Sequence, residues 1–148
     1  MNACASDPIG FLKEVHRDQR RTIYEWNSPE EGYSYNFFEI HAAIPLGNHY
    51  HTKKDEVFHI MKGGGVVVMQ AIDPKTGQPS GERTTQSLKA RSVVHVRAFT
   101  AHTFVLEPGS EMSCYSSSHY DEKNNDMTGV KLVDGAEAER LLAETPKL

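Results

Sequence analysis

The sequence predicts an all-β fold, a barrel or sandwich of short strands that is followed by one short helix. Many short strands separated by regular turns are typical of such folds. We expect strands at residues 11–15, 22–26, 33–44, 56–61, 66–72, 84–88, 93–97, 103–106 and 112–116. Residues 136–144 combine good helix formers with an acidic first turn after Asp134 and Gly135, which predicts a helix.

The N-terminal elements are predicted from alternation and from turn residues. Residues 11–15 alternate apolar and polar side chains, and residues 22–26 are rich in β-branched and aromatic ones. Pro, Asn and Gly at 27–32 indicate a loop. Residues 33–44 form the longest strand candidate, with one packed face and one semi-polar face. The semi-polar face carries Tyr35, Phe37, Glu39 and His41.

The later elements follow from glycines and apolar runs. Pro45 to Gly47 bends or breaks the chain, and three glycines at 63–65 allow a tight turn with positive φ. Residues 66–72 are continuously apolar, which predicts a strand buried on both faces. Residues 73–81 predict an exposed hairpin loop, and 107–110 predict a tight turn between the last two strands.

Length and composition predict one domain over residues 1–148. We expect a barrel core at about 33–118, N-terminal strands at 11–26, and a C-terminal tail and helix at 119–148. Two cysteines, Cys4 and Cys114, are too few for a disulfide framework. The sequence shows neither an apolar run of membrane-spanning length nor a signal peptide, so we expect a cytoplasmic protein without membrane contact.

The charge pattern argues against nucleic-acid binding. The formal net charge is −4, which disfavours a general role in binding polyanions. Arg17, Arg20 and Arg21 form a local basic cluster with His16, and we interpret this cluster as a solvated turn.

Two histidines and a glutamate form the strongest chemical pattern. His49 and His51 are two residues apart and therefore share one face of an extended segment. Glu56 follows after a short turn, and His102 on a later strand is the candidate for a third imidazole. Imidazoles and a carboxylate suit divalent transition metals, so we predict one bound Zn, Fe, Mn or Ni ion.

This segment resembles the first motif of the cupin superfamily, in which two histidines, a glutamate and a glycine recur at fixed spacing. His49, His51, Glu56 and Gly63 match that spacing, whereas the leading glycine of the motif falls at Ala43. The resemblance implies a double-stranded β-helix, the jelly-roll barrel of the cupins, and a pairing of two copies as a homodimer.

The second cupin motif is degenerate around His102. Its two glycines fall at Arg91 and Phe99, its proline at Arg97 and its asparagine at Leu106. Arg97 has the parity of Val93 and His95. It can therefore point at the cavity and bind an anionic group, or it can be an exposed arginine.

Residues 47–53 are similar to cupin domains that act with enzymes of nucleotide-linked deoxysugars in capsule and surface polysaccharide synthesis. The tail at 118–126 shares the acidic character of the tail in those domains. The resemblance favours a metal-dependent isomerase, epimerase or cyclase that acts on a small, oxygen-rich molecule by Lewis-acid and proton-transfer chemistry. An iron-dependent dioxygenase and a non-catalytic metal- or small-ligand-binding module stay open.

Candidate groups for substrate binding and proton transfer lie near the metal motif in sequence or on neighbouring strands. His41, Tyr35 and Tyr50 are candidate proton-transfer groups. We expect the substrate pocket to be lined by Glu39, Gln70, Arg97 and Phe104. Whether His41 or His95 lines the pocket depends on the strand register, which the bend before Gly47 leaves open.

Overall fold

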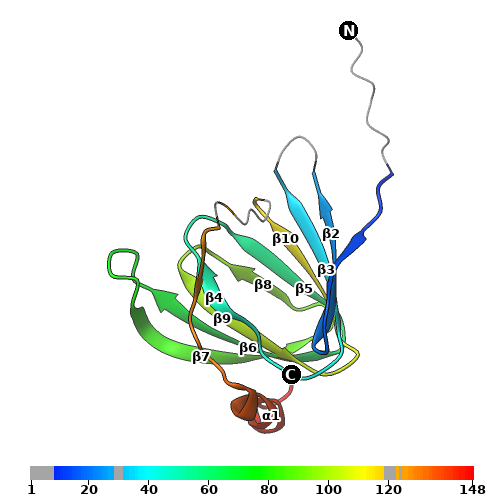
Figure 1. The fold of residues 1–148 in the computed structure, drawn as a ribbon. Coiled ribbons are helices and arrows are strands. Elements are labelled where there is room, and N and C mark those ends of the chain that lie inside the picture. Colours follow the sequence, from blue (N-terminus) through cyan, green and yellow to red (C-terminus); the bar gives the residue numbers. More distant parts are fainter. Residues whose placement is uncertain (1–8, 29–31, 119–122, 124) are drawn as a thin grey trace.

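A computed structural model shows two antiparallel sheets that face each other, with one helix beneath the second sheet (Figure 1). It describes residues 9–28, 32–118, 123 and 125–148, so that Cys4 and part of the acidic tail lie outside the described residues. The first sheet has the strand order β1-β2-β3-β10-β5-β8, and the second has the order β11-β4-β9-β6-β7. This arrangement confirms the predicted all-β jelly roll with a short C-terminal helix.

The elements have the following bounds. The strands are β1 (Lys13–Arg17), β2 (Arg21–Asn27), β3 (Ser34–Ile40), β4 (Leu46–His51), β5 (Glu56–Lys62), β6 (Gly64–Ile72), β7 (Pro79–Lys89), β8 (Val93–Val96), β9 (Thr100–Leu106), β10 (Glu111–Ser116) and β11 (Met127–Gly129). The helix α1 covers Gly135–Glu144, and Asp134 caps it by accepting a hydrogen bond from the Glu137 amide. No helix among the described residues is long and apolar enough to span a membrane.

The main core fills the space between the two sheets. Side chains of β5 and β10 meet those of β6 and β9 there, because alternate residues of each strand point inward. The core consists of Ile40, Leu46, Phe58, Ile60, Val67, Val94, Val96, Phe104, Leu106, Met112 and Cys114. Burying this much apolar surface is the main driving force for closing the two sheets on each other.

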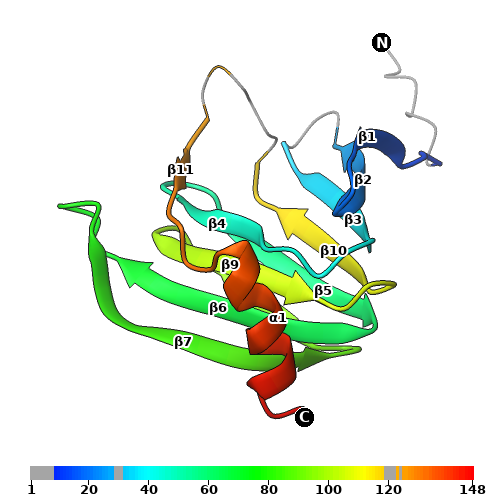
Figure 2. The same cartoon turned by 60° about the horizontal axis from the view of Figure 1, so that its bottom comes forward.

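A second core lies on the outer face of the β4-β9-β6 sheet, where α1 packs (Figure 2). It includes Tyr50, Val66, Val68, Val105 and Ala138. Both β6 and β9 are therefore buried on both faces, as the continuous apolar run at 66–72 predicts. The helix thus covers a sheet face that would otherwise expose apolar side chains.

Several predicted boundaries are wrong. The long strand expected at 33–44 ends at Ile40, because the His41 and Ala42 amides turn back to bond the Arg20 carbonyl. The hairpin loop expected at 73–81 is shorter, since β7 begins at Pro79 and pairs with β6. The sequence also gave no indication of β11, which pairs with β4 and lies next to the histidine segment.

Gly63, the glycine that closes the first motif, has no room for a side chain. Its φ is +77°, and an added Cβ would lie 2.9 Å from Ser110 Cα. We expect Gly63→Ala to lower the free energy of unfolding by about 3 kcal/mol, since the left-handed backbone costs about 1–2 kcal/mol and crowding about 1–3 kcal/mol. Urea denaturation measures this change.

Gly109→Ala is the matched control for this substitution. Gly109 has a φ of +86°, but an added Cβ would meet no atom of the described part of the chain within 4 Å. The control should lose only the backbone contribution, about 1–2 kcal/mol. Equal losses in the two variants would show that crowding against Ser110 is unimportant.

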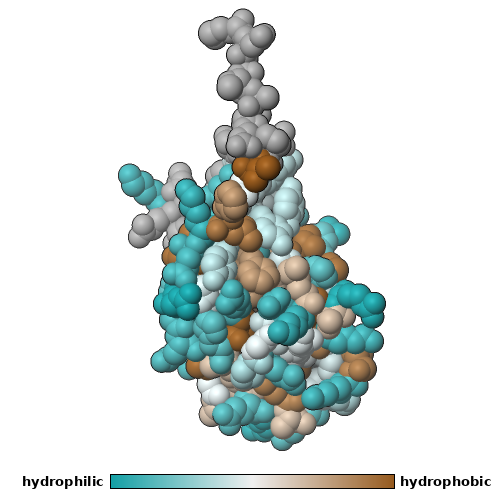
Figure 3. All heavy atoms as spheres, turned by 90° about the vertical axis from the view of Figure 1, so that its right-hand side faces the viewer, coloured by the Kyte–Doolittle hydropathy of each residue, from teal (hydrophilic) through white to brown (hydrophobic). Residues whose placement is uncertain are grey.

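Apolar side chains are exposed near the N-terminal edge of the first sheet. Figure 3 shows apolar atoms on this face just below the N-terminal segment. Ile9, Phe11, Val15 and Trp26 are exposed, and β1 is the edge strand of its sheet. The predicted homodimer stays a prediction.

Candidate metal site

Three strands bring the predicted metal ligands together inside the barrel. His49 and His51 lie on β4, Glu56 begins β5 and His102 lies on β9. β4 and β9 are antiparallel neighbours, and His49 is directly opposite His102 in the register. The two imidazoles therefore lie side by side, with ring centroids 4.8 Å apart.

A bulge in β4 sets this register. The pairing of β4 with β9 shifts between Gly47 and His49, and the bulge residues Gly47 and Asn48 have φ of +124° and +56°. An added Cβ at Gly47 would lie 2.6 Å from the His102 carbonyl oxygen, so glycine is required at this close approach. The Asn48 amide anchors the bulge to the segment before α1, since it accepts from the Leu132 and Val133 amides and donates to the Val133 carbonyl.

The ligand atoms converge on one point. His49, His51 and Glu56 each offer one atom within 4.8 Å of the others. Glu56 Oε1 lies 3.2 Å from His51 Nε2 and 3.5 Å from His102 Nε2. His51, Glu56 and His102 are buried, and His49 is half-buried. The four residues predicted as ligands thus surround a single small volume.

Neighbouring acceptors fix which nitrogen of two imidazoles faces this point. His51 Nδ1 lies 2.9 Å from Asp126 Oδ1, and His102 Nδ1 lies 3.1 Å from the Thr100 carbonyl oxygen. A carbonyl oxygen or a carboxylate can only accept, so we assign the Nδ1 proton to both rings. The Nε2 atoms that face Glu56 are then free to bind a cation.

The electrostatics of this cluster fit a bound cation. Glu56 Oε1 is buried, faces two imidazole nitrogens and has no hydrogen-bond partner among the residues that the structure describes. Despite burial, the neighbouring imidazoles of His51 and His102 lower the pKa of Glu56 to about 2. Burial, together with the charges of His102 and His51, lowers the pKa of His49 to about 4. Despite burial, Glu56 and Asp126 raise the pKa of His51. A carboxylate beside imidazoles is the donor set of a divalent transition metal, whose binding displaces protons from the ligand nitrogens.

A small cavity of about 100 Å³ opens onto three of these residues. His49, Glu56 and His102 form one part of its wall, and Arg21 contributes a cationic group. The rest of the wall is Phe38, Leu46, Gly47, Phe58, Phe104 and Met112. The cavity therefore combines a polar ligand cluster with a mostly apolar lining, as small-molecule sites usually do.

The three candidate proton-transfer groups lie away from this cavity. His41 is exposed, and its Nε2 lies 2.7 Å from Thr22 Oγ1. Tyr50 alternates with His49 and His51 and so points into the second core, where its ring packs against Phe99. Tyr35 is half-buried on β3 and does not line the cavity.

Of the four residues expected to line the pocket, only Phe104 does so. Gln70 instead donates to the Gly81 carbonyl, and Glu39 lies outside the cavity wall on β3. Arg97 is exposed, as is His95, because Val94 and Val96 take the inward positions of β8. The parity that Arg97 shares with Val93 and His95 is the outward one, so of the two interpretations the exposed arginine is correct.

Three further residues contact or face the cluster, although the sequence analysis did not predict them as site residues. Asp126 bonds His51 and also accepts from the Lys53 and Lys54 amides. Despite partial burial, the bond with His51 and those with the two amides lower the pKa of Asp126 to about 2. Cys114 Sγ lies 3.6 Å from Glu56 Oε2, and burial raises the pKa of its thiol. Arg21 lines the cavity and is not part of a solvated turn.

We expect Asp126→Asn to weaken metal binding. The amide cannot accept the His51 Nδ1 proton as strongly as a carboxylate does, so the imidazole becomes a poorer and less well oriented ligand. Loss of such an outer partner typically costs about 10- to 100-fold in metal affinity. Competition with a chelating dye measures this change, with Asp134→Asn at the cap of α1 as the control. Unchanged affinity in Asp126→Asn would show that this contact does not support the site.

A known protein family matches most of the chain. Residues 16–128 match the family described as the polysaccharide biosynthesis C-terminal domain. A stretch of 57 residues is 32% identical to UDP-2-acetamido-2,6-beta-L-arabino-hexul-4-ose reductase from Pseudomonas aeruginosa, and it covers 38% of this chain and 15% of the reductase.

Solved structures share the fold. The capsular polysaccharide assembling protein CapF from Staphylococcus aureus superimposes with a TM-score of 0.66 at 21% identity, over 84% of this chain and 33% of CapF. Streptomyces PAC13 with uridine gives 0.60 at 11% identity, over 88% and 98% of the two chains. Bacillus subtilis oxalate decarboxylase gives 0.58 at 13% identity, over 78% and 29%. These likenesses confirm the predicted cupin fold, and the chain spans only part of the length of CapF and the reductase.

Proposed function

The chain belongs to the polysaccharide biosynthesis C-terminal domain family, and we propose that it is a metal-dependent cupin enzyme that acts on a small, oxygen-rich molecule. The reaction we propose is an isomerisation, epimerisation or cyclisation next to a carbonyl group. We further propose that residues 1–148 act as one domain. One observation carries the proposal. A cluster of three imidazoles and one carboxylate contributes His49, His102 and Glu56 to the wall of a cavity that is otherwise largely apolar.

Each part of the wall has a defined role in this proposal. His49, His51, Glu56 and His102 would hold the metal, and Asp126 and the Thr100 carbonyl would orient two of the imidazoles. A bound divalent ion supplies Lewis-acid polarisation of a carbonyl, which makes the adjacent carbon acidic. The apolar wall would exclude water from the reacting group and so strengthen the electrostatic interactions within the cavity.

The comparisons support an oxygen-rich substrate. A structure of CapF contains an inhibitor that is a tropolone, a ring with adjacent carbonyl and hydroxyl oxygens. The relative from Pseudomonas aeruginosa is named as a reductase of a UDP-linked hexulose, which is itself a carbonyl compound. We propose that the substrate here presents the same hydroxy-carbonyl group, on a ketosugar or a similar small ring.

An iron-dependent dioxygenase is the second candidate, and a specific observation favours it. Among the described residues that line the cavity, Arg21 is the only ionisable group beside the proposed ligands. A proton transfer at carbon needs an acid or a base within reach, whereas attack by oxygen does not need one from the protein. The same ligand set serves iron and the non-redox metals alike.

Anaerobic assays separate the two candidates. Ketosugars and hydroxy-carbonyl rings are incubated with the metal-loaded protein under strict exclusion of oxygen, and the exchange of carbon-bound hydrogen with deuterated water is followed by NMR. The proposed function predicts exchange or isomerisation without oxygen. Turnover that appears only with oxygen, and consumes it stoichiometrically, would assign the protein to the dioxygenase class.

A further inference from the structure

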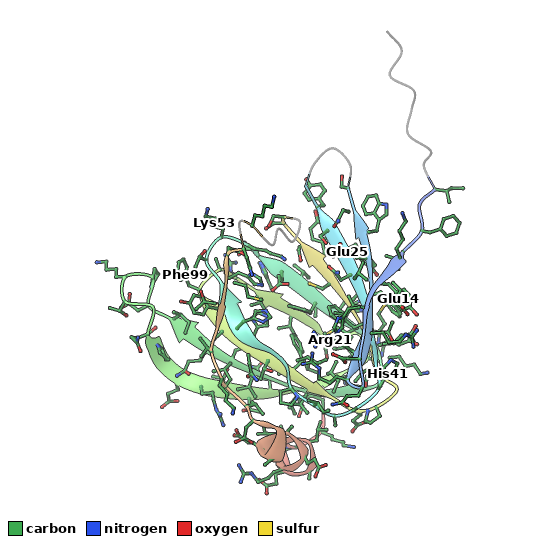
Figure 4. The ribbon with its side chains drawn as sticks, in the orientation of Figure 1. Glu14, Arg21, Glu25, His41, Lys53 and Phe99 are labelled. Carbon is green, nitrogen blue, oxygen red and sulfur yellow. The ribbon has the colours of Figure 1, made fainter. Side chains whose placement is uncertain are left out.

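Arg21 places a positive charge in the wall of the metal cavity. It is the first residue of β2, and its side chain extends toward the space between the sheets, whereas His41 lies at the outer side of the same end (Figure 4). Its Nε is fully buried and has no hydrogen-bond partner among the described residues. A buried guanidinium nitrogen without a partner is costly, so this group is poised to bind an acceptor.

The neighbouring arginine shows the contrast. Arg20 donates from Nε and Nη2 to the carboxylate of Asp18, at 3.1 and 2.9 Å. The backbone amide of Arg21 donates to Asp18, whereas its side-chain Nε has no hydrogen-bond partner within the described part of the chain. Burial and the charge of Arg20 lower the pKa of Arg21, and the charge of Asp18 offsets this only in part. Of the two adjacent arginines, Arg20 therefore has its charge balanced by Asp18, whereas the charge of Arg21 is not balanced in this way.

The surroundings indicate what Arg21 would bind. The wall around it is apolar, with Phe38, Leu46 and Met112 among its members, so a charge-assisted bond there is only weakly screened by water. The guanidinium fork matches the paired oxygens of a carboxylate or a phosphate. Three of the four proposed metal ligands line the same cavity of about 100 Å³, so a molecule held at the metal and Arg21 together must be small or enter with one end.

We propose that Arg21 is a specificity-determining residue that binds an anionic carboxylate or phosphate group of the substrate while the hydroxy-carbonyl group lies at the metal ligands. This inference rests on the proposed function and narrows its substrate to an acidic molecule. No bond is made or broken at Arg21, so its contribution is to affinity and orientation.

Two pyranones provide the test. Kojic acid and comenic acid share one hydroxy-ketone, but comenic acid carries a carboxylate where kojic acid carries a hydroxymethyl group. Calorimetry with the metal-loaded protein should show that comenic acid binds about 10- to 100-fold more tightly, the usual range for a charged hydrogen bond. Arg21→Met should abolish this preference, whereas Arg20→Met should keep both the preference and the affinity for kojic acid. The phosphate ester of kojic acid is measured in the same way. Comparing its affinity with that of comenic acid shows whether Arg21 prefers a phosphate or a carboxylate.

Each outcome decides a different question. If neither anionic probe is preferred over kojic acid, or if neither binds, the proposal that Arg21 binds an anionic group is wrong. This result leaves the proposed metal site unaffected. A preference that survives in Arg21→Met also overturns it. If kojic acid binds the metal-free protein as tightly as the metal-loaded one, the proposed function fails. A preference for the anionic probes that still depends on Arg21 in the metal-free protein would support the anion site by itself.

Discussion

The double variant His49→Ala/His51→Ala is expected to purify without stoichiometric metal. It removes two of the four proposed ligands, and both lie within one bulged strand whose pairing with β9 brings them to His102. Glu56 and His102 alone leave too few donors for a divalent transition metal to be held through purification. Metal content per chain, measured by elemental analysis, gives the result directly.

His59→Ala/His95→Ala is the matched control for the double variant. These two histidines lie on β5 and β8, on the opposite face of the sheet from the core residues Phe58 and Val94. Removing them changes the histidine count equally without touching the cavity. Full metal content in the His49 and His51 variant would place the metal elsewhere.

Phe104→Ala is expected to cause the largest loss of stability. Phe104 is 1% exposed, and its ring lies 4.6 Å from that of Phe58 between centroids. Removing a buried aromatic ring typically costs about 3–5 kcal/mol, from lost burial and the cavity left behind. That is a large share of the roughly 5–15 kcal/mol by which domains are usually stable. Urea denaturation measures the change.

Phe11→Ala makes the same chemical change at a residue that is 79% exposed. It should alter the free energy of unfolding by no more than about 0.5 kcal/mol. A similar loss in both variants would mean that Phe104 does not pack as the structure shows. Metal content of Phe104→Ala, if it folds, should be close to that of the unmodified protein, because Phe104 supplies no ligand atom.

The first motif could be predicted from sequence because it is local. His49, His51 and Glu56 lie within eight residues, and strand alternation alone places the two imidazoles on one face. The parity of β8 could not be predicted in the same way, because Val93 and Val94 are equally apolar and only the pairing with β5 decides which is buried. The expectation that Arg97 lines the pocket is wrong for this reason.

The second motif survives in the backbone although its glycines are absent. Arg91 and Phe99 stand at its two glycine positions, and both have positive φ, +79° and +58°. The conformation that favours glycine is thus retained with other side chains, and packing of Phe99 against Tyr50 accompanies it at one position. The sequence does not indicate positive φ at these two positions, because neither residue is a glycine.

Long-range contacts account for the site residues that sequence reasoning missed. Asp126 lies 75 residues after His51, and only the return of the chain past β4 brings it to that imidazole. Arg20 and Arg21 are neighbours in a basic segment, but their side chains have different environments. Arg21 on β2 points inward and lines the cavity, whereas Arg20 in the preceding turn bonds Asp18. Local composition predicts a solvated cluster for all of them.

X-ray absorption spectroscopy at the edge of the metal with which the protein purifies tests the ligand set most directly. The imidazole scattering pattern reports the number of histidines, and the nearest shell separates nitrogen and oxygen from sulfur. The site of His49, His51, Glu56 and His102 predicts three imidazoles, a carboxylate oxygen and no sulfur, with one imidazole lost in His102→Ala. A sulfur scatterer, or fewer than two imidazoles in the unmodified protein, would contradict it.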